Sequence, residues 1–242
     1  MHDFEKELIR VANINKATEN LINSDTSSTF FALYEHMIKV NEEMNLTAIT
    51  DTDGVILKHF VDSCAVVPEI PEDATLCDIG CGGGFPTLPV AILRSDVSIL
   101  GVDSVTKKVE YVKNTSKLLG LDNVNVSNRR AEELGKDVEY REKFDVVLAR
   151  GVGKLNLLCE LCLPLVKIGG CFIAMKAIGI HEEIKQAENA IKTLGAKIEK
   201  VIEYTLTNEK ETLTRAMIVL KKQTHTPPKY PRNNSQISKK LL

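Results

Sequence analysis

Short apolar runs alternate with longer amphipathic stretches between Ala74 and Lys221, and this alternation constrains the fold more than any other feature of the sequence. It is typical of βαβ units around a mostly parallel sheet. We expect helices at about 86–94, 105–119, 154–165 and 181–194, the last ended by Gly195 as a glycine C-cap. Because no helix is predicted between the last two strands, these two strands should pair in antiparallel fashion. The expected strands are 75–79, 98–103, 124–127, 144–149, 170–176, 197–204 and 214–221.

The segments on either side of this series have different patterns. In the first 45 residues the apolar side chains fall near helical spacing, with Ser27 or Ser28 as a candidate N-cap. The last segment contains Pro227, Pro228 and Pro231, which favour an extended arm over a regular helix. We therefore predict an N-terminal helical cap over 1–72, an α/β core over 73–222 and an extended basic tail over 223–242.

Composition excludes several classes of protein. With 242 residues, 43% hydrophobic and 26% charged, the chain has the profile of an ordinary globular enzyme with one large domain. No apolar run approaches the roughly 20 residues that span a bilayer. Acidic Asp3, Glu5 and Glu7 do not fit a secretory signal. We therefore expect a cytoplasmic protein without a membrane partner. We also expect a monomer.

The six cysteines are scattered through predicted strands and helices, which indicates free thiols in a reducing compartment. Cys159 and Cys162 form a C-x-x-C pattern on a predicted helix, but no second pair or histidine lies nearby in the sequence. Core packing is therefore the favoured interpretation, and we expect no metal site.

A glycine-rich stretch follows the first predicted strand, where the chain should turn into the first helix. It reads Asp78-Ile79-Gly80-Cys81-Gly82-Gly83-Gly84-Phe85-Pro86. Glycines let the backbone turn sharply and approach a ligand closely. A dinucleotide fingerprint would need a third glycine where Phe85 stands. The D-x-G-x-G-x-G pattern instead predicts S-adenosylmethionine, with Asp78 facing its positive end and Gly80, Gly82 and Gly84 along it; a tight turn without a ligand is the alternative.

Two further segments fall where such a fold would hold the rest of that ligand. Asp103 ends the second predicted strand nineteen residues after Gly84, where a carboxylate grips the two ribose hydroxyls. Ala131 and Glu132 follow the third strand, within reach of an adenine edge. Glu132 has an equally simple explanation as an acid at a helix N-terminus.

Arg150 follows the fourth strand, at the position that usually faces the substrate. A surface ion pair would also explain it. From Lys221 onward the chain has six basic side chains and no carboxylate, although the formal net charge is only −2. Such a tail favours contact with phosphates, and a solvated terminus is the alternative.

Motifs along nearly the whole chain together resemble the RsmG (GidB) family, the bacterial small-subunit ribosomal RNA guanine-N7 methyltransferases. The family is expected to have the Rossmann-like class I S-adenosylmethionine-dependent methyltransferase fold, with seven strands and an antiparallel last strand. The chain departs from the family pattern at Gly151-Val152-Gly153 and at Ala177. The motifs are Asn45-Leu46-Thr47-Ala48-Ile49, His59-x-x-Asp62-Ser63, Asp78 to Pro86, Asp103-Ser104, Lys107-Lys108, Arg130-Ala131-Glu132, Ala149-Arg150, Met175-Lys176 and Tyr230-Pro231-Arg232.

Carried over residue by residue, the resemblance implies an enzyme that binds S-adenosylmethionine through Gly80, Phe85, Ala131, Glu132 and Arg150. It implies that Arg130, Arg150 and Lys176 line the RNA and active-site face. Its partner would be small-subunit ribosomal RNA or the 30S particle.

Three residues of the cap have two open interpretations. Asn45 could cap a turn, and His59 with Asp62 could be a pair on a helix surface. Alternatively, all three shape the cofactor pocket from the cap side.

Guanine N7 is an in-plane lone pair, so no general base is needed to accept the methyl group. Alignment of N7, methyl carbon and sulfur would then supply most of the catalysis, up to roughly 7–11 kcal/mol. The product ring gains positive charge, so we assign Arg130, Arg150 and Lys176 to phosphates or to guanine O6. Three rival functions stay open from sequence alone: an NAD-dependent oxidoreductase, a non-catalytic RNA-binding protein on this scaffold, and a methyltransferase of a small molecule or another RNA.

Overall fold

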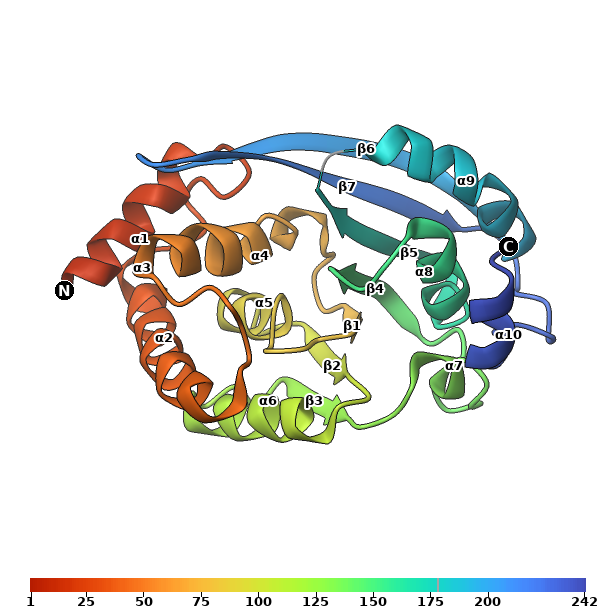
Figure 1. The fold of residues 1–242 in the computed structure, drawn as a ribbon, viewed down its shortest axis with the longest axis horizontal. Helices are drawn as coiled ribbons and strands as arrows, with labels where there is room; N and C mark the ends of the chain where they lie inside the picture. Colours follow the sequence, from red (N-terminus) through yellow and green to blue (C-terminus); the bar gives the residue numbers. More distant parts are fainter. Residues whose placement is uncertain (178) are drawn as a thin grey trace.

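A seven-stranded sheet runs through the centre of the computed structural model, which describes residues 1–177 and 179–242 (Figure 1). The strand order is β3-β2-β1-β4-β5-β7-β6. The strands β1 to β5 are parallel, and β7 is antiparallel to both β5 and β6, which confirms the predicted final hairpin. The strands are β1 Thr75–Ile79, β2 Ser98–Val102, β3 Val124–Ser127, β4 Phe144–Arg150, β5 Val166–Lys176, β6 Ala196–Thr207 and β7 Thr212–Lys222.

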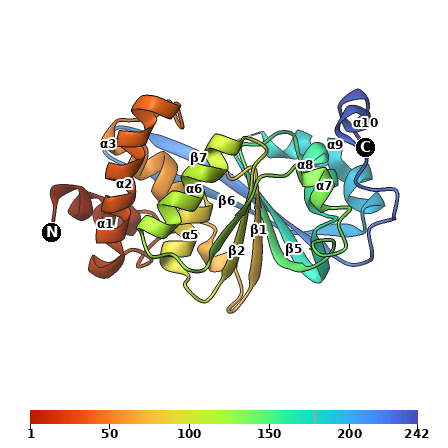
Figure 2. The ribbon, with the colours of Figure 1, turned by 90° about the horizontal axis from the view of Figure 1, so that it is seen from below.

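Helices cover both faces of the sheet (Figure 2). One face carries α5 (Thr87–Leu93) and α6 (Thr106–Leu118), and the other carries α7 (Ala131–Leu134), α8 (Leu155–Cys162) and α9 (Ile180–Thr193). Side chains alternate along each strand, as in Val146 and Val147 of β4, which belong to different apolar clusters. This is the expected three-layer α/β arrangement.

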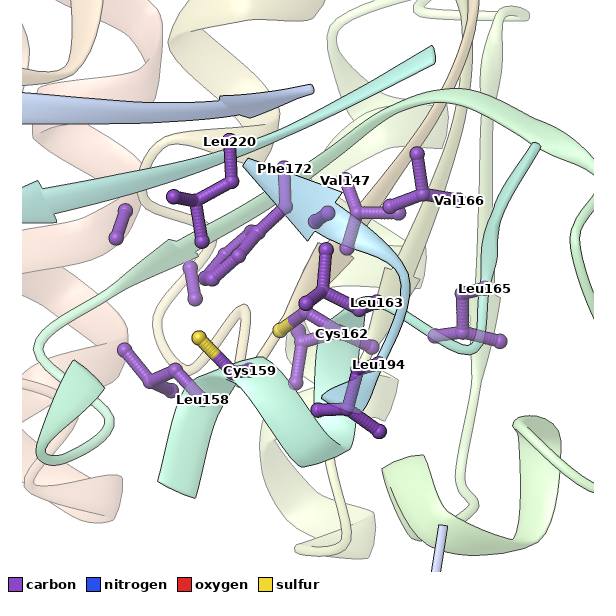
Figure 3. Packing of buried hydrophobic residues seen from close by; sticks show 14 of the residues in the cluster. Val147, Leu158, Cys159, Cys162, Leu163, Leu165, Val166, Phe172, Leu194 and Leu220 are labelled. Atoms are coloured by element: carbon purple, nitrogen blue, oxygen red, sulfur yellow. The ribbon is translucent and has the colours of Figure 1, made fainter. Parts of the chain in front are cut away.

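The cluster between the sheet and α8 is completely closed to solvent at its centre. Phe172 of β5 and Leu220 of β7 pack there with Cys159 and Cys162 of α8, and Figure 3 shows both sulfur atoms within this cluster. Burial raises the pKa of both thiols well above the ordinary value. The two cysteines therefore pack as apolar side chains.

The N-terminal helices lie beside α5 and α6 (Figure 1). The long helices are α1 (Asp3–Ile14) and α2 (Ser24–Met44), followed by α3 (Thr52–Gly54), the π-helical turn η1 (Val55–Val61), α4 (Asp62–Cys64) and the 3-10 turn η2 (Val67–Glu69). Apolar side chains of these helices join Phe85 and Tyr111 in one buried cluster. The predicted N-cap is wrong: Asn23 caps α2 by accepting from the backbone of Asp25 and Thr26, because the helix begins one turn earlier.

The C-terminal segment is folded onto the core, and the prediction of an extended arm is wrong. Asn234–Lys239 form the helix α10, capped by the Asn233 side chain, and Ile237 within it is 1% exposed. Figure 1 shows α10 beside α7 and α8. The three prolines precede this helix rather than interrupt it. Two of the six basic side chains are used inside the molecule, since Lys222 binds the Leu163 carbonyl and Arg232 binds Glu160.

The described residues contain no helix that is both long and apolar enough to cross a membrane. The domain boundaries at residues 72 and 222 stay a prediction.

Candidate functional site

The glycine-rich bend after β1 is made of left-handed backbone. Gly80, Gly82 and Gly84 have φ values of +77°, +54° and +87°. A Cβ on Gly84 would lie 2.5 Å from Leu88 Cδ1 of α5, and a Cβ on Gly80 would lie 2.5 Å from Val152 Cγ2. Gly84 is therefore required where the helix meets the bend, and Gly80 is required where the segment after β4 crosses it.

Asp78 lies behind the bend and is fully buried. Its Oδ2 accepts a hydrogen bond of 2.6 Å from Thr87 Oγ1, and its Oδ1 has no partner in the part of the chain that the structure describes. Burial raises the pKa of Asp78 to about 6, against the lowering effect of Thr87 and Arg150. The carboxylate fixes the start of α5, and its free oxygen is a buried acceptor beside the bend.

Asp103 connects the end of β2 to the bend. Its Oδ2 accepts from the Gly82 amide at 3.0 Å and its Oδ1 accepts from the Val105 amide at 2.8 Å. The side chain also lines a cavity of about 270 Å³, which we name the bend cavity. A carboxylate has lone pairs beyond these two bonds, so Asp103 can still accept from hydroxyl groups of a ligand. Other residues of the bend cavity are Gly80, Arg130, Ala131, Glu132, Val152 and Asn234.

On the other side of Gly80, the cap covers the bend with an aromatic stack. The ring of His59 in η1 lies 4.7 Å from that of Phe85 with 11° between the planes, and His59 Nε2 is 2.7 Å from Thr47 Oγ1. Burial, helped by the nearby Arg150, lowers the pKa of His59 to about 4, so the ring is neutral at pH 7. These residues line a second cavity of about 400 Å³, the cap cavity, which Gly80 and Arg150 also line.

The interpretation of His59 and Asp62 as a helix-surface pair is wrong, because both are buried and their partners lie on other elements. Asp62 accepts from Arg150 Nη1 at 3.0 Å and from Arg215 Nε of β7 at 3.1 Å. Asn45 ends α2 with φ of 51°, which agrees with a capping role. Arg150 also donates to the Lys58 carbonyl and lies 5.7 Å from the centre of the Phe85 ring.

Lys176 ends β5 beside this group. Its Nζ donates to the Gly153 carbonyl at 2.5 Å and lies 2.6 Å from Glu183 of α9. Glu183 also accepts from the Leu155 amide, so Glu183 and Lys176 together hold the part of the chain that leads from Gly153 into α8. Lys176 lines a third cavity of about 390 Å³, the edge cavity, together with Asp62, Arg150, Met175, Tyr204 and Arg215.

The structure brings most of the predicted site residues to one edge of the sheet. Gly80, Asp103, Ala131 and Glu132 surround the bend cavity, and Phe85 lines the cap cavity. Of the three predicted active-site cations, Arg150 and Lys176 share the edge cavity. Arg130 lies apart from them at the N-cap of α7, exposed and beside the bend cavity.

The sequence did not predict several residues of these cavities, among them Arg215, Tyr204 and Asn234. Arg215 begins an apolar run in β7, and a charged residue at that position was the available signal. Its partner Asp62 is 153 residues away, so no local pattern relates the two. Asn234 follows three prolines in the tail, and no motif marks it.

The residues present fit S-adenosylmethionine. The bend cavity offers a carboxylate for ribose and a pocket between Asp103 and Glu132 for a base. Gly80 lines both the bend and cap cavities, and Val152 lies against it, so a ligand that spans them must pass the Val152 side chain. Asp78 Oδ1 is a buried acceptor behind that passage. Within residues 1–177 and 179–242, no group of three or more His, Cys, Asp or Glu side chains is arranged to hold a metal ion.

Comparison with known proteins finds one family over most of the chain. The family model GidB, described as rRNA small subunit methyltransferase G, matches residues 26–213. The chain is 40% identical to ribosomal RNA small subunit methyltransferase G of Acetivibrio thermocellus over 242 residues, covering 98% of this chain and 99% of that one. It is 43% identical to the protein of the same name from Bacillus licheniformis over 228 residues, covering 91% and 95%.

Solved structures with the same fold share much less sequence. The O-methyltransferase of Bacillus cereus, crystallised with SAH, superposes with a TM-score of 0.54 at 19% identity, covering 78% of this chain and 91% of that one. TYW2 of M. jannaschii in complex with AdoMet gives 0.55 at 16% identity, covering 72% and 79%. These similarities support the class I methyltransferase fold.

Proposed function

The chain belongs to the rRNA small subunit methyltransferase G family and is an S-adenosylmethionine-dependent methyltransferase, and from this premise we propose that it methylates N7 of a guanine in small-subunit ribosomal RNA. We further propose that it acts as a monomer in the cytoplasm, on the 30S particle or on its RNA. The observation that carries the proposal is a row of three neighbouring cavities that share lining residues. Gly80 lines both the bend and cap cavities, and Arg150 lines both the cap and edge cavities.

We assign the cofactor to the first two cavities. Asp103 would accept from the ribose hydroxyls, and Ala131 with Glu132 would bind the adenine. Gly80, Gly82 and Gly84 set the bend along which the cofactor would lie, and Phe85 and Arg150 would bound it on the cap side. Asp78, behind the bend, adds negative potential near the cofactor's positive groups.

The edge cavity is the place we assign to the target guanine. Met175 and Tyr204 supply apolar surface, while Arg150, Lys176 and Arg215 supply donors for guanine O6 and for phosphates. When bound, S-adenosylmethionine supplies an electrophilic methyl group on a sulfonium. N7 presents a lone pair with no proton to remove, so these residues need only hold the base in line with that methyl group.

The charge of the product explains why the cations are paired. A guanine methylated at N7 is positive, and a free cation beside it would oppose the reaction. Arg150 and Arg215 share the carboxylate of Asp62, and Lys176 is held by Glu183. The carboxylates offset the cations, so donors can be aimed at O6 and phosphates with little net positive charge near the ring. Arg130, which is exposed, is assigned to a phosphate of the RNA.

One experiment tests the proposal directly. 30S particles and deproteinised 16S RNA, both from a strain that lacks this gene, are incubated with the protein and labelled S-adenosylmethionine. We expect label in the RNA at a single guanine, which nuclease digestion and mass spectrometry locate as N7-methylguanosine. Label in protein or small molecules, or at another atom of the RNA, would contradict the proposal. The two substrates separate recognition of the particle from recognition of naked RNA.

A further inference from the structure

The C-terminal segment contributes a side chain to the bend cavity. Asn234, the first residue of α10, is one of the residues that line it, together with Ala131 and Glu132 after β3 and Leu161 of α8. The basic composition of the tail favours contact with phosphates or a solvated terminus. Its position beside the bend cavity adds a contact with the cofactor pocket.

Anchors on either side hold this segment in place. Before Asn234, Arg232 donates to the buried Glu160 of α8 through Nε at 2.8 Å, through Nη2 at 2.6 Å and through its backbone amide at 2.9 Å. After it, Ile237 is 1% exposed within the apolar core. Glu160 is the neighbour of Leu161, so the same turn of α8 lines the cavity and fixes the residue that precedes Asn233 and Asn234. Asn234 is therefore held at the cavity rim by a bidentate ion pair on a rigid helix.

Pro231 adds a further contact at the base of α7. A Cβ on Gly135 would lie 2.8 Å from Pro231 Cγ, so the tail packs directly on the end of the helix that begins with Ala131 and Glu132. Arg141 binds the carbonyls of Tyr230 and Thr226, both at 2.7 Å. The tail and the start of α7 therefore form one wall of the cavity.

The chemistry of Asn234 matches one part of the cofactor. Its side-chain amide forms no hydrogen bond with any residue that the structure describes, and the residue is exposed. A carboxamide donates and accepts at once, which is the complement of the adenine N6 amino group and its adjacent ring nitrogen. Asp103 fixes the ribose end of the same cavity, so the base falls toward Ala131, Glu132 and Asn234.

From this arrangement, and resting on the proposed function, we propose that Asn234 binds the adenine of the cofactor and that the C-terminal segment is a wall of the cofactor pocket. The adenine then contacts residues from three separate segments: β3 to α7, α8, and α10. Removal of the tail lowers cofactor affinity in addition to any effect on RNA.

Calorimetry with two probes tests this proposal in the full-length protein. The probes are S-adenosylhomocysteine and S-inosylhomocysteine, in which an oxygen replaces the N6 amino group. We expect Asn234→Ala to weaken S-adenosylhomocysteine binding about five- to tenfold and to reduce the preference over the inosine analogue. Ser238→Ala, on the same helix and outside the cavity lining, is the matched control and should bind both probes as the wild type does.

The outcomes separate this inference from the function it rests on. If wild-type protein binds neither probe, the proposed function itself fails. Two outcomes with a wild-type protein that binds S-adenosylhomocysteine would show that Asn234 does not bind the adenine. In the first, Asn234→Ala binds S-adenosylhomocysteine as well as the wild type does. In the second, Asn234→Ala loses affinity for both probes to the same extent. Thermal unfolding of each variant shows whether α10 stays folded.

Discussion

The cofactor side and the substrate side of this site are built in different ways. Around the bend, the main elements are backbone conformation and close neighbours in the chain, such as Asp78 with Thr87. The edge cavity is instead built from charged side chains of distant segments. Asp62 binds Arg150, which is 88 residues away in the sequence, and Arg215, which is 153 residues away. The backbone of the bend is set mainly by local geometry. The edge cavity exists only once the cap and the last hairpin are both in place.

This difference has a consequence for substitutions. A change in the bend should damage stability and cofactor binding together, since its glycines are required for packing. A change in the edge cavity should damage RNA methylation while leaving the cofactor in place.

Gly84→Ala should lower the free energy of unfolding by about 3 kcal/mol, because the new methyl group meets Leu88 and the residue keeps a φ of +87°. The matched control is Gly120→Ala, which has φ of +67° but no atom within 4 Å of the added Cβ. Its loss should be about 1 kcal/mol, from backbone strain alone. Urea unfolding measures both. Equal losses would mean that packing against α5 does not define the bend.

Arg215→Met should lower kcat/KM for RNA about 30-fold, from loss of about 2 kcal/mol of hydrogen bonding to a charged partner. Its affinity for S-adenosylhomocysteine should stay within about twofold, because the Arg215 side chain, which lines both the edge and cap cavities, is held by Asp62 and is assigned to the guanine. Lys167→Met is the control, since this lysine pairs with Asp145 near the start of β5. A parallel loss of cofactor affinity would break the division between the two regions.

His59 and Asp78 should give opposite pH dependence of stability. The pKa of His59 is lowered from 6.5 to about 4, so its contribution to the unfolding free energy falls as pH drops through that range. The pKa of Asp78 is raised from 3.8 to about 6, so its contribution falls as pH rises from 3.8 to 6. Between pH 4 and 6 the two effects oppose each other.

Single variants should therefore reveal each slope. In the wild type, His59 makes the unfolding free energy rise with pH by up to about 1.4 kcal/mol per pH unit, and His59→Gln should remove this rise. Asp78 makes the unfolding free energy fall with pH by a similar amount, and Asp78→Asn should remove this fall. Urea unfolding at several pH values between 4 and 6 provides the measurement. Unchanged slopes in both variants would show that neither group is buried as described.

Arg130→Gln should reduce the salt dependence of RNA binding by about 0.7 in the slope of log affinity against log salt, the effect of one phosphate contact with a single strand. Arg129→Gln is the comparison, because Arg129 already pairs with Asp137 at 2.9 Å and should change the slope less. Filter binding at several salt concentrations measures both. Reduced cofactor affinity with an unchanged slope would place Arg130 on the cofactor side instead.

Much of the cofactor side could be predicted from the sequence. The alternation of short apolar runs with amphipathic stretches predicted all seven strands in order. The D-x-G-x-G-x-G pattern predicted the bend and the class of its ligand. Both depend on local backbone demands, which appear in the sequence as glycine positions and apolar periodicity. The family resemblance rests on the same motifs and is confirmed by the match over residues 26–213.

Only the tertiary structure decided the role of the cap, the tail and the charged network. The residues that flank His59 in the sequence do not show that its ring stacks on Phe85. Likewise, the residues that flank Asn234 do not show that it lines the bend cavity, whose other walls come from segments far away in the sequence. A six-residue helix such as α10 is too short to be stable by itself, so its formation depends on burying Ile237 against the core. Local patterns in a sequence record the conformation of the backbone, whereas ion pairs and cavity walls depend on which distant segments the completed sheet brings together.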